Sequence, residues 1–214
     1  MHKKTVEKWA IENGVTITPQ QYEELAAFQK KVLDVNKSMN LTRITDPEEF
    51  AVKHFIDSMT LLPHIPYGAT VLDIGTGAGF PGVVLGILRH DIRLELLDSL
   101  KKRVSFLEDA LVMLGLDGTV NCIPYRAEDW ARTGVEYDVC TARAVAKMDK
   151  LLKYAMPLVR PGGVLLAMKG ADVGAEIDAA RSTFVKYNSD VKLVKSVHLS
   201  DEITHSIVVV EKQL

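Results

Sequence analysis

Apolar positions in the first part of the chain recur at spacings of three and four, which predicts helices. Thr18-Pro19-Gln20-Gln21 places a hydroxyl, a proline and a glutamine where the start of a helix uses them. Helical spacing then continues to about Lys37. Asp46-Pro47-Glu48-Glu49 opens a second helix, which Pro63 ends. We therefore expect residues 1–64 to form a helical cap.

From Thr70 the pattern changes to short apolar runs that alternate with helical segments. The runs cover residues 70–74, 93–97, 118–123, 137–141 and 164–168. Such alternation predicts an α/β fold, with a parallel sheet covered by helices on both faces. Two β-rich runs near the end, 191–199 and 206–210, are close enough to pair as a hairpin at the sheet edge. Residues 65–214 are expected to form one structural unit, on which the cap packs.

Charge and composition limit the cellular compartments and the classes of partner that the sequence permits. The chain has 214 residues with 26 Lys and Arg against 28 Asp and Glu, which argues against a basic surface throughout but permits a local basic patch. Its apolar runs fall far short of the roughly 20 residues of a membrane span. No signal peptide is visible, so we expect a cytoplasmic protein without membrane contact. Cys122 and Cys140 show no paired spacing, which predicts reduced thiols and no metal site.

A glycine-rich turn after the first strand carries the strongest chemical signal. Gly75, Gly77 and Gly79 follow the strand and Pro81 begins the next helix, as in turns that let a nucleotide-like cofactor approach the backbone. The dinucleotide pattern needs glycine where Phe80 stands, so NAD is disfavoured. No Gly-Lys-Ser/Thr follows, which excludes a P-loop. The structural alternative is a turn that only packs tightly.

Three charged residues near strand ends have both a functional and a structural interpretation. Asp98 ends the next strand, where a carboxylate can accept both hydroxyls of a ribose, although Asp98 or Ser99 can equally cap the following helix. Glu128 is either a ligand contact or a solvated loop acid. Arg143 either lies at the ligand crevice or forms an ion pair on the surface.

Several blocks together resemble a known family. They are residues 72–82, 97–107, 126–128, 141–144 and 168–170, with Asn40-Leu41-Thr42 and His54–Ser58 before them. The chain resembles the class I S-adenosylmethionine-dependent methyltransferases and, within them, the glucose-inhibited division protein B family, which methylates guanine N7 in small-subunit (16S) ribosomal RNA. The resemblance implies a Rossmann-like class I methyltransferase fold with a mostly parallel seven-stranded sheet and an antiparallel edge strand.

The resemblance also implies roles for individual residues at an S-adenosylmethionine site. Gly75 and Phe80 would line the site, Gly77 and Gly79 would shape the turn, Asp98 would hold the ribose, Ala127 and Glu128 would lie beside the adenine, and Arg143 would complete the site. Thr76 and Thr141 stand where many relatives have serine, and both keep the hydroxyl.

The implied chemistry needs little from side chains. Guanine N7 carries a free lone pair, so its methylation requires no general base. Alignment and electrostatics can then supply most of the catalysis, and no single catalytic residue is assigned. The absence of an Asn-Pro-Pro-Tyr motif agrees weakly with an N7 target.

RNA contacts must come from local positive charge. The candidates are Arg43, His54, Lys101, Arg103 and Lys169. A solvated helix face, or a packed structural role for the histidine, is the alternative. Since guanine N7 is hard to reach in duplex RNA, an open loop or an assembly intermediate is the favoured substrate. We expect a monomer whose partner is small-subunit ribosomal RNA within a ribonucleoprotein particle. Methylation of a small metabolite and non-catalytic assistance to ribosome assembly stay open as alternatives.

Overall fold

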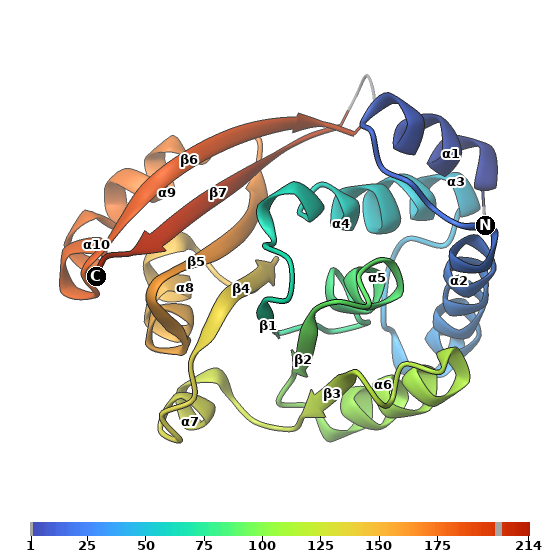
Figure 1. Ribbon diagram of the computed structural model, residues 1–214, viewed down its shortest axis with the longest axis horizontal. Helices are drawn as coiled ribbons and strands as arrows, with labels where there is room; N and C mark the ends of the chain where they lie inside the picture. The colour runs from blue at the N-terminus through green and yellow to red at the C-terminus, as the bar shows by residue number, and fades with distance from the viewer. Residues whose placement is uncertain (1, 200–202) are drawn as a thin grey trace.

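One seven-stranded sheet forms the centre of the described residues, 2–199 and 203–214, of this computed structural model (Figure 1). The strand order is β3-β2-β1-β4-β5-β7-β6. The strands are β1 (Thr70–Ile74), β2 (Arg93–Leu97), β3 (Val120–Ile123), β4 (Tyr137–Arg143), β5 (Val159–Gly170), β6 (Ser189–His198) and β7 (Thr204–Lys212). Strands β1 to β5 run parallel, and β7 is antiparallel to β5 and β6. The predicted fold class is confirmed. The antiparallel strand, β7, is next to the edge of the sheet, because β6 pairs with its outer side and forms the edge itself.

Helices cover both faces of this sheet (Figure 1). They are α1 (Lys3–Glu12), α2 (Pro19–Met39), α3 (Pro47–Phe50), η1 (Ala51–Ile56), α4 (Asp57–Met59), η2 (Leu62–His64), α5 (Gly82–Leu88), α6 (Lys101–Leu114), α7 (Ala127–Ala131), α8 (Met148–Ala155), η3 (Met156–Leu158), α9 (Gly174–Ala179) and α10 (Arg181–Lys186). Successive strand residues point to opposite faces: Val71 packs with α2, α5 and α6, and Leu72 packs with α7, α8 and α10. Within the described residues, no helix is both long and apolar enough to cross a membrane.

Three helical segments in succession replace the single helix predicted after Asp46. Asp46 accepts hydrogen bonds from the backbone N–H groups of Glu48 (3.0 Å) and Glu49 (2.8 Å), as an N-cap does. The chain continues through α3, the π-helical η1 and α4 before Pro63. The helical span was predicted, but its π-helical middle was not. Such turns are rare and often mark functional sites, and this one contains His54.

A buried carboxylate holds the glycine-rich turn. Asp73 accepts hydrogen bonds from the backbone N–H of Gly82 (2.9 Å) and the hydroxyl of Thr141 (2.9 Å). Its complete burial raises the pKa of Asp73 to about 6. A Cβ at Gly82 would lie 2.2 Å from Leu96 Cδ2, so only glycine lets α5 approach the sheet this closely. The turn therefore packs tightly on its α5 side.

Candidate functional site

The other side of the glycine-rich turn opens into a cavity of about 400 Å³, here called the turn cavity. It lies at the carboxyl ends of β1 and β2 and is lined by Gly75, Asp98, Ala127 and Glu128, together with apolar groups such as Val145. Gly75 has a φ of +67°, and a Cβ there would lie 3.0 Å from Val145 Cγ2. Open α/β sheets bind ligands at this edge. The structure therefore brings four of the predicted cofactor residues to one cavity.

Asp98 is the organising carboxylate of the turn cavity. It is only 5% exposed, and its Oδ2 accepts a hydrogen bond from the Gly77 backbone N–H at 3.1 Å. Its Oδ1 accepts from the Leu100 backbone N–H at 2.9 Å, and Arg103 Nη1 lies 3.4 Å from Oδ2. Neither Asp98 nor Ser99 is the N-cap of α6, since Leu100 holds that position and the Asp98 carboxylate reaches only the N–H of Leu100 itself. The Gly77 backbone N–H thus fixes the glycine-rich turn to the carboxylate of Asp98.

The turn cavity fits S-adenosylmethionine in its size and in its polar groups. Its volume lies within the usual range for small-molecule sites, roughly 300–1,000 Å³. Asp98 offers carboxylate oxygens for ribose hydroxyls on one side. Ala127 and Glu128, at the start of α7, offer a backbone N–H and a carboxylate on the other side, next to the apolar wall that includes Leu97 and Leu100. These groups suit a nucleoside with an apolar base face.

Phe80 and Gly79 lie outside the lining of the turn cavity. Phe80 is 3% exposed, and its ring stacks on the His54 ring at 4.3 Å between centroids with an interplanar angle of 7°. The Arg143 guanidinium lies 5.2 Å from the same ring. At Gly79 a Cβ would lie 2.9 Å from the Phe28 ring. Both residues therefore join the turn to the packed N-terminal helices.

His54 is a buried, neutral histidine in this cluster. Arg143 Nη2 donates to His54 Nδ1 at 3.0 Å, so Nδ1 carries a lone pair and Nε2–H donates to Thr42 Oγ1 at 2.9 Å. Burial, reinforced by the positive charges of Arg143 and Lys53, lowers the pKa of His54 to about 3. His54 was predicted as an RNA contact, and the structure places it in the core, 6% exposed.

Arg143, at the end of β4, is held by residues far away in the sequence. Its Nη1 donates to the Lys53 backbone carbonyl at 2.7 Å and lies 3.3 Å from Asp57 Oδ2. Asp57 is 2% exposed, and its Oδ1 lies 3.0 Å from His205 Nδ1 on β7. The hydrogen bond to Asp57 raises the pKa of His205. Arg143 therefore belongs to a buried ionic network and not to a surface ion pair.

A second cavity of about 400 Å³ lies beside the turn cavity, between the carboxyl ends of β4 and β5. This β4–β5 cavity is lined by Arg143, Ala144, Val145, Ala146, Lys147, Met168, Lys169, Gly170, Glu176 and His205. Ala144 and Val145 line both cavities. Lys169 is 9% exposed on its side chain, and its Nζ donates to the Ala146 carbonyl (2.6 Å) and to Glu176 Oε2 (2.8 Å). Lys169 thus lines this cavity with its ammonium group paired to Glu176.

The remaining RNA candidates are more accessible. Arg43 and Lys101 are exposed, and Arg103 is partly exposed beside Asp98. Lys101 and Arg103 lie at the start of α6, next to the mouth of the turn cavity that Arg103 helps to line. Arg43 lies in the loop between α2 and α3.

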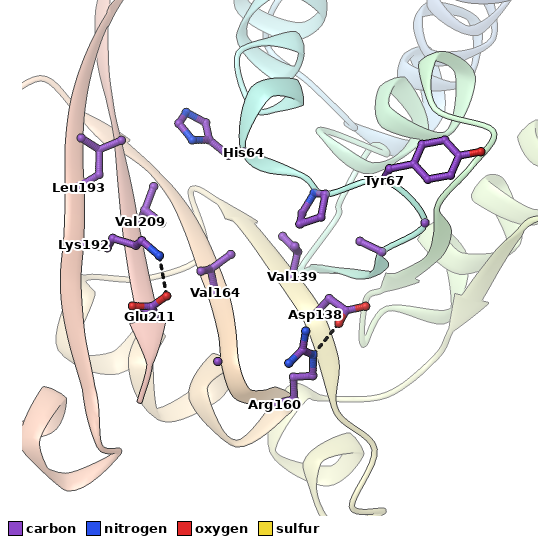
Figure 2. Close-up of a pocket in the computed structure, with 14 residues that line it drawn as sticks. His64, Tyr67, Asp138, Val139, Arg160, Val164, Lys192, Leu193, Val209 and Glu211 are labelled. Atoms are coloured by element: carbon purple, nitrogen blue, oxygen red, sulfur yellow. Dashed lines mark hydrogen bonds and ion pairs between the residues drawn. The ribbon is translucent and has the colours of Figure 1, made fainter. Parts of the chain in front are cut away.

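Figure 2 shows a larger cavity, of about 630 Å³, among the amino ends of β1, β4 and β5. Its main charged groups pair with one another: Arg160 Nε lies 2.5 Å from Asp138 Oδ1, and Lys192 Nζ lies 2.6 Å from Glu211 Oε1. Because it lies at the amino ends of these strands, this cavity is at the edge of the sheet opposite to the one where such sheets bind ligands.

Sequence reasoning missed Asp57, Glu176 and His205. Asp57 lies within the block His54–Ser58 that carried part of the resemblance, so a signal for it existed. Glu176 and His205 lie beyond the last of the recognised blocks. Only the packing of α9 against α8 and the pairing of β7 with β5 bring them to the site.

Comparison with known proteins identifies the family of this chain. The model of the family described as rRNA small subunit methyltransferase G matches residues 21–206. Proteins named ribosomal RNA small subunit methyltransferase G from Desulfitobacterium hafniense and Lactobacillus delbrueckii are 39% and 40% identical, over 93% and 92% of this chain and 84% and 85% of their own. The fold is also that of a Bacillus cereus O-methyltransferase solved with S-adenosylhomocysteine, with a TM-score of 0.61 at 18% identity over 87% of this chain and 91% of that one. The chain therefore belongs to the rRNA small subunit methyltransferase G family.

Proposed function

We propose that this protein methylates N7 of a guanine in small-subunit ribosomal RNA, with S-adenosylmethionine as the methyl donor. Membership in the family makes it an S-adenosylmethionine-dependent methyltransferase of that RNA. The observation that carries the proposal is the pair of cavities at the carboxyl edge of the sheet. One has the groups for a nucleoside cofactor, and the other adjoins it along Ala144 and Val145.

We assign the cofactor to the turn cavity. Asp98 would accept the ribose hydroxyls, Gly75 would allow the close backbone approach, and Ala127 and Glu128 would address the adenine edge. Gly77, Gly79, Phe80 and Arg143 would act indirectly, by fixing the turn and the end of β4. When bound, S-adenosylmethionine supplies an electrophilic methyl group on a positively charged sulfur.

Guanine N7 asks little of the side chains at this site, because its lone pair can be methylated without a general base. His54, the buried imidazole nearest to Arg143, already uses both of its ring nitrogens. N7 needs no deprotonation, so the residues have to align the base and exclude water.

We further propose that the enzyme acts as a cytoplasmic monomer on a ribonucleoprotein particle. Residues 1–64 act in this proposal as a helical cap on the methyltransferase unit of residues 65–214. The exposed cations Arg43 and Lys101, with the partly exposed Arg103, would contact phosphates. A net charge of −2 provides little general attraction for naked RNA, which favours recognition of a folded particle.

Transfer of a labelled methyl group to unmodified 30S particles tests this function. The experiment compares 30S particles with deproteinised small-subunit RNA and maps the modified base. We expect label on guanine N7, with particles the better substrate, and a strong loss in Asp98→Asn. Asp109→Asn, at an exposed position on α6, is the matched control and should behave as wild type. Label at another atom or only on free metabolites would overturn the proposal.

A further inference from the structure

The β4–β5 cavity is polar, and it shares a wall with the turn cavity. Ala144, which lines both, has a φ of +55°, a left-handed conformation that costs energy for any residue with a Cβ. Such strain is concentrated at ligand sites, because there the surroundings impose it. A group held in the β4–β5 cavity therefore lies next to whatever occupies the turn cavity.

Glu176 is the only acid among the residues that line this cavity in the described part of the chain. Its Oε2 accepts from the Met148 backbone N–H (3.0 Å) and from Lys169 Nζ (2.8 Å). Among the described residues, no hydrogen bond reaches Oε1. The hydrogen bond from Lys169 lowers the pKa of Glu176, so the group stays an acceptor at neutral pH. The cavity wall thus presents a fixed acceptor beside a fixed ammonium donor.

We propose that the β4–β5 cavity receives the target guanine, with Glu176 accepting from N1–H and the N2 amino group while Lys169 donates to O6. The inference rests on the proposed function and names the base pocket of that same site. The Watson–Crick edge of guanine places an acceptor, O6, beside two donors, which matches an ammonium beside a carboxylate. Holding that edge leaves N7 unengaged.

The same pair of side chains discriminates against other bases. Adenine would place its N1 acceptor opposite the carboxylate, and two facing acceptors repel. Inosine keeps N1–H and O6 but lacks the N2 amino group, so it loses one of the two hydrogen bonds to Glu176. N7 takes no part in these contacts, so 7-methylguanine keeps the same hydrogen bonds as guanine. These differences give the pocket a ligand order that can be measured without catalysis.

Binding of mononucleotides to the full-length protein tests the assignment. The protein is saturated with S-adenosylhomocysteine, and Kd values are measured by calorimetry for guanosine, inosine, adenosine and 7-methylguanosine monophosphates. We expect the guanosine nucleotide to bind about tenfold more tightly than the inosine nucleotide, since each hydrogen bond to a charged group accounts for about that factor. Wild-type protein that binds the two equally would overturn the inference.

Glu176→Gln should remove the preference for guanosine over inosine and leave S-adenosylhomocysteine affinity unchanged. Asp178→Asn is the matched control, because Asp178 lies on the same helix, is exposed and pairs only with Arg181 among the described residues. A Glu176→Gln protein that stays folded and keeps the tenfold preference would refute the pocket. Mapping of the methyl group to an atom other than N7 would refute the proposed function while leaving this binding order intact, so the two failures are distinguishable.

Discussion

His54 should make the protein sensitive to acid, and its replacement by phenylalanine should remove that sensitivity. The imidazole is 6% exposed and accepts a hydrogen bond from Arg143, so a proton on Nδ1 would face a guanidinium. Burial lowers the pKa of His54 to about 3 in the folded protein, against about 6.5 in an unfolded chain. Between about pH 6.5 and pH 3 the unfolded state therefore binds up to one more proton than the folded state.

The sign and size of the effect follow from that difference. Stability falls as the pH falls wherever the unfolded state binds more protons, by about 1.4 kcal/mol per pH unit for one group. Between pH 7.5 and 5.0, His54 should account for a loss of about 2 kcal/mol in the free energy of unfolding. His54→Phe keeps a ring to stack on Phe80 but has no titrating nitrogen. It should be less stable at pH 7.5, because Arg143 loses an acceptor.

Urea unfolding of both proteins at pH 7.5, 6.5 and 5.0 measures the difference. The wild-type protein should lose about 2 kcal/mol more than His54→Phe across this range. His90→Phe, a change at an exposed position after α5, serves as the control and should retain the wild-type dependence. Equal losses in the wild-type and His54→Phe proteins would show that His54 is not held neutral by its surroundings.

Other sites give further expectations. Gly82→Ala should destabilise the fold by about 1–3 kcal/mol or prevent folding, because the added Cβ would lie 2.2 Å from Leu96 Cδ2; a wild-type thermal midpoint would contradict this. Asp98→Asn should weaken S-adenosylmethionine binding about 10- to 150-fold by calorimetry, the loss expected for charged hydrogen bonds to the ribose. The imidazole of His205 should titrate in NMR spectra with a midpoint above 6.5. The stabilisation from its pairing with Asp57 is fully present below pH 6.5 and is lost as the pH rises through that midpoint. Asp57→Asn should lower the midpoint, and an unchanged value would exclude that pairing.

Most of the sheet and one side of the site were predictable from the sequence. The central parallel strands are buried on both faces, so they appear as apolar runs, and the bounds of β1 and β2 match their runs. Gly75 and Asp98 directly follow β1 and β2, and Ala127 and Glu128 begin the helix that follows β3. Parallel strands bring such ends to one edge, so these residues share a cavity.

The parts that were not predictable depend on contacts between distant segments. Nothing local in the sequence indicates that Phe80 leaves the cavity wall to stack on His54, or that η1 adopts a π-helical turn. The carboxylate of Asp57 meets Arg143 from 86 residues away and His205 from 148 residues away. Such pairings follow from helix and sheet packing, which a single sequence does not display as a pattern.

Arg143 shows how the N-terminal helices take part in the site. The Arg143 guanidinium is only partly exposed and needs acceptors. It finds them in the Lys53 carbonyl, the His54 ring and the Asp57 carboxylate, all from η1 and α4. Its face lies over Phe80, which follows the glycine-rich turn. The end of β4, where the two cavities meet, is thus held against the turn by residues of the first 64. Loosening of η1 and α4 would therefore displace both cavities together, since each includes residues adjoining this arginine.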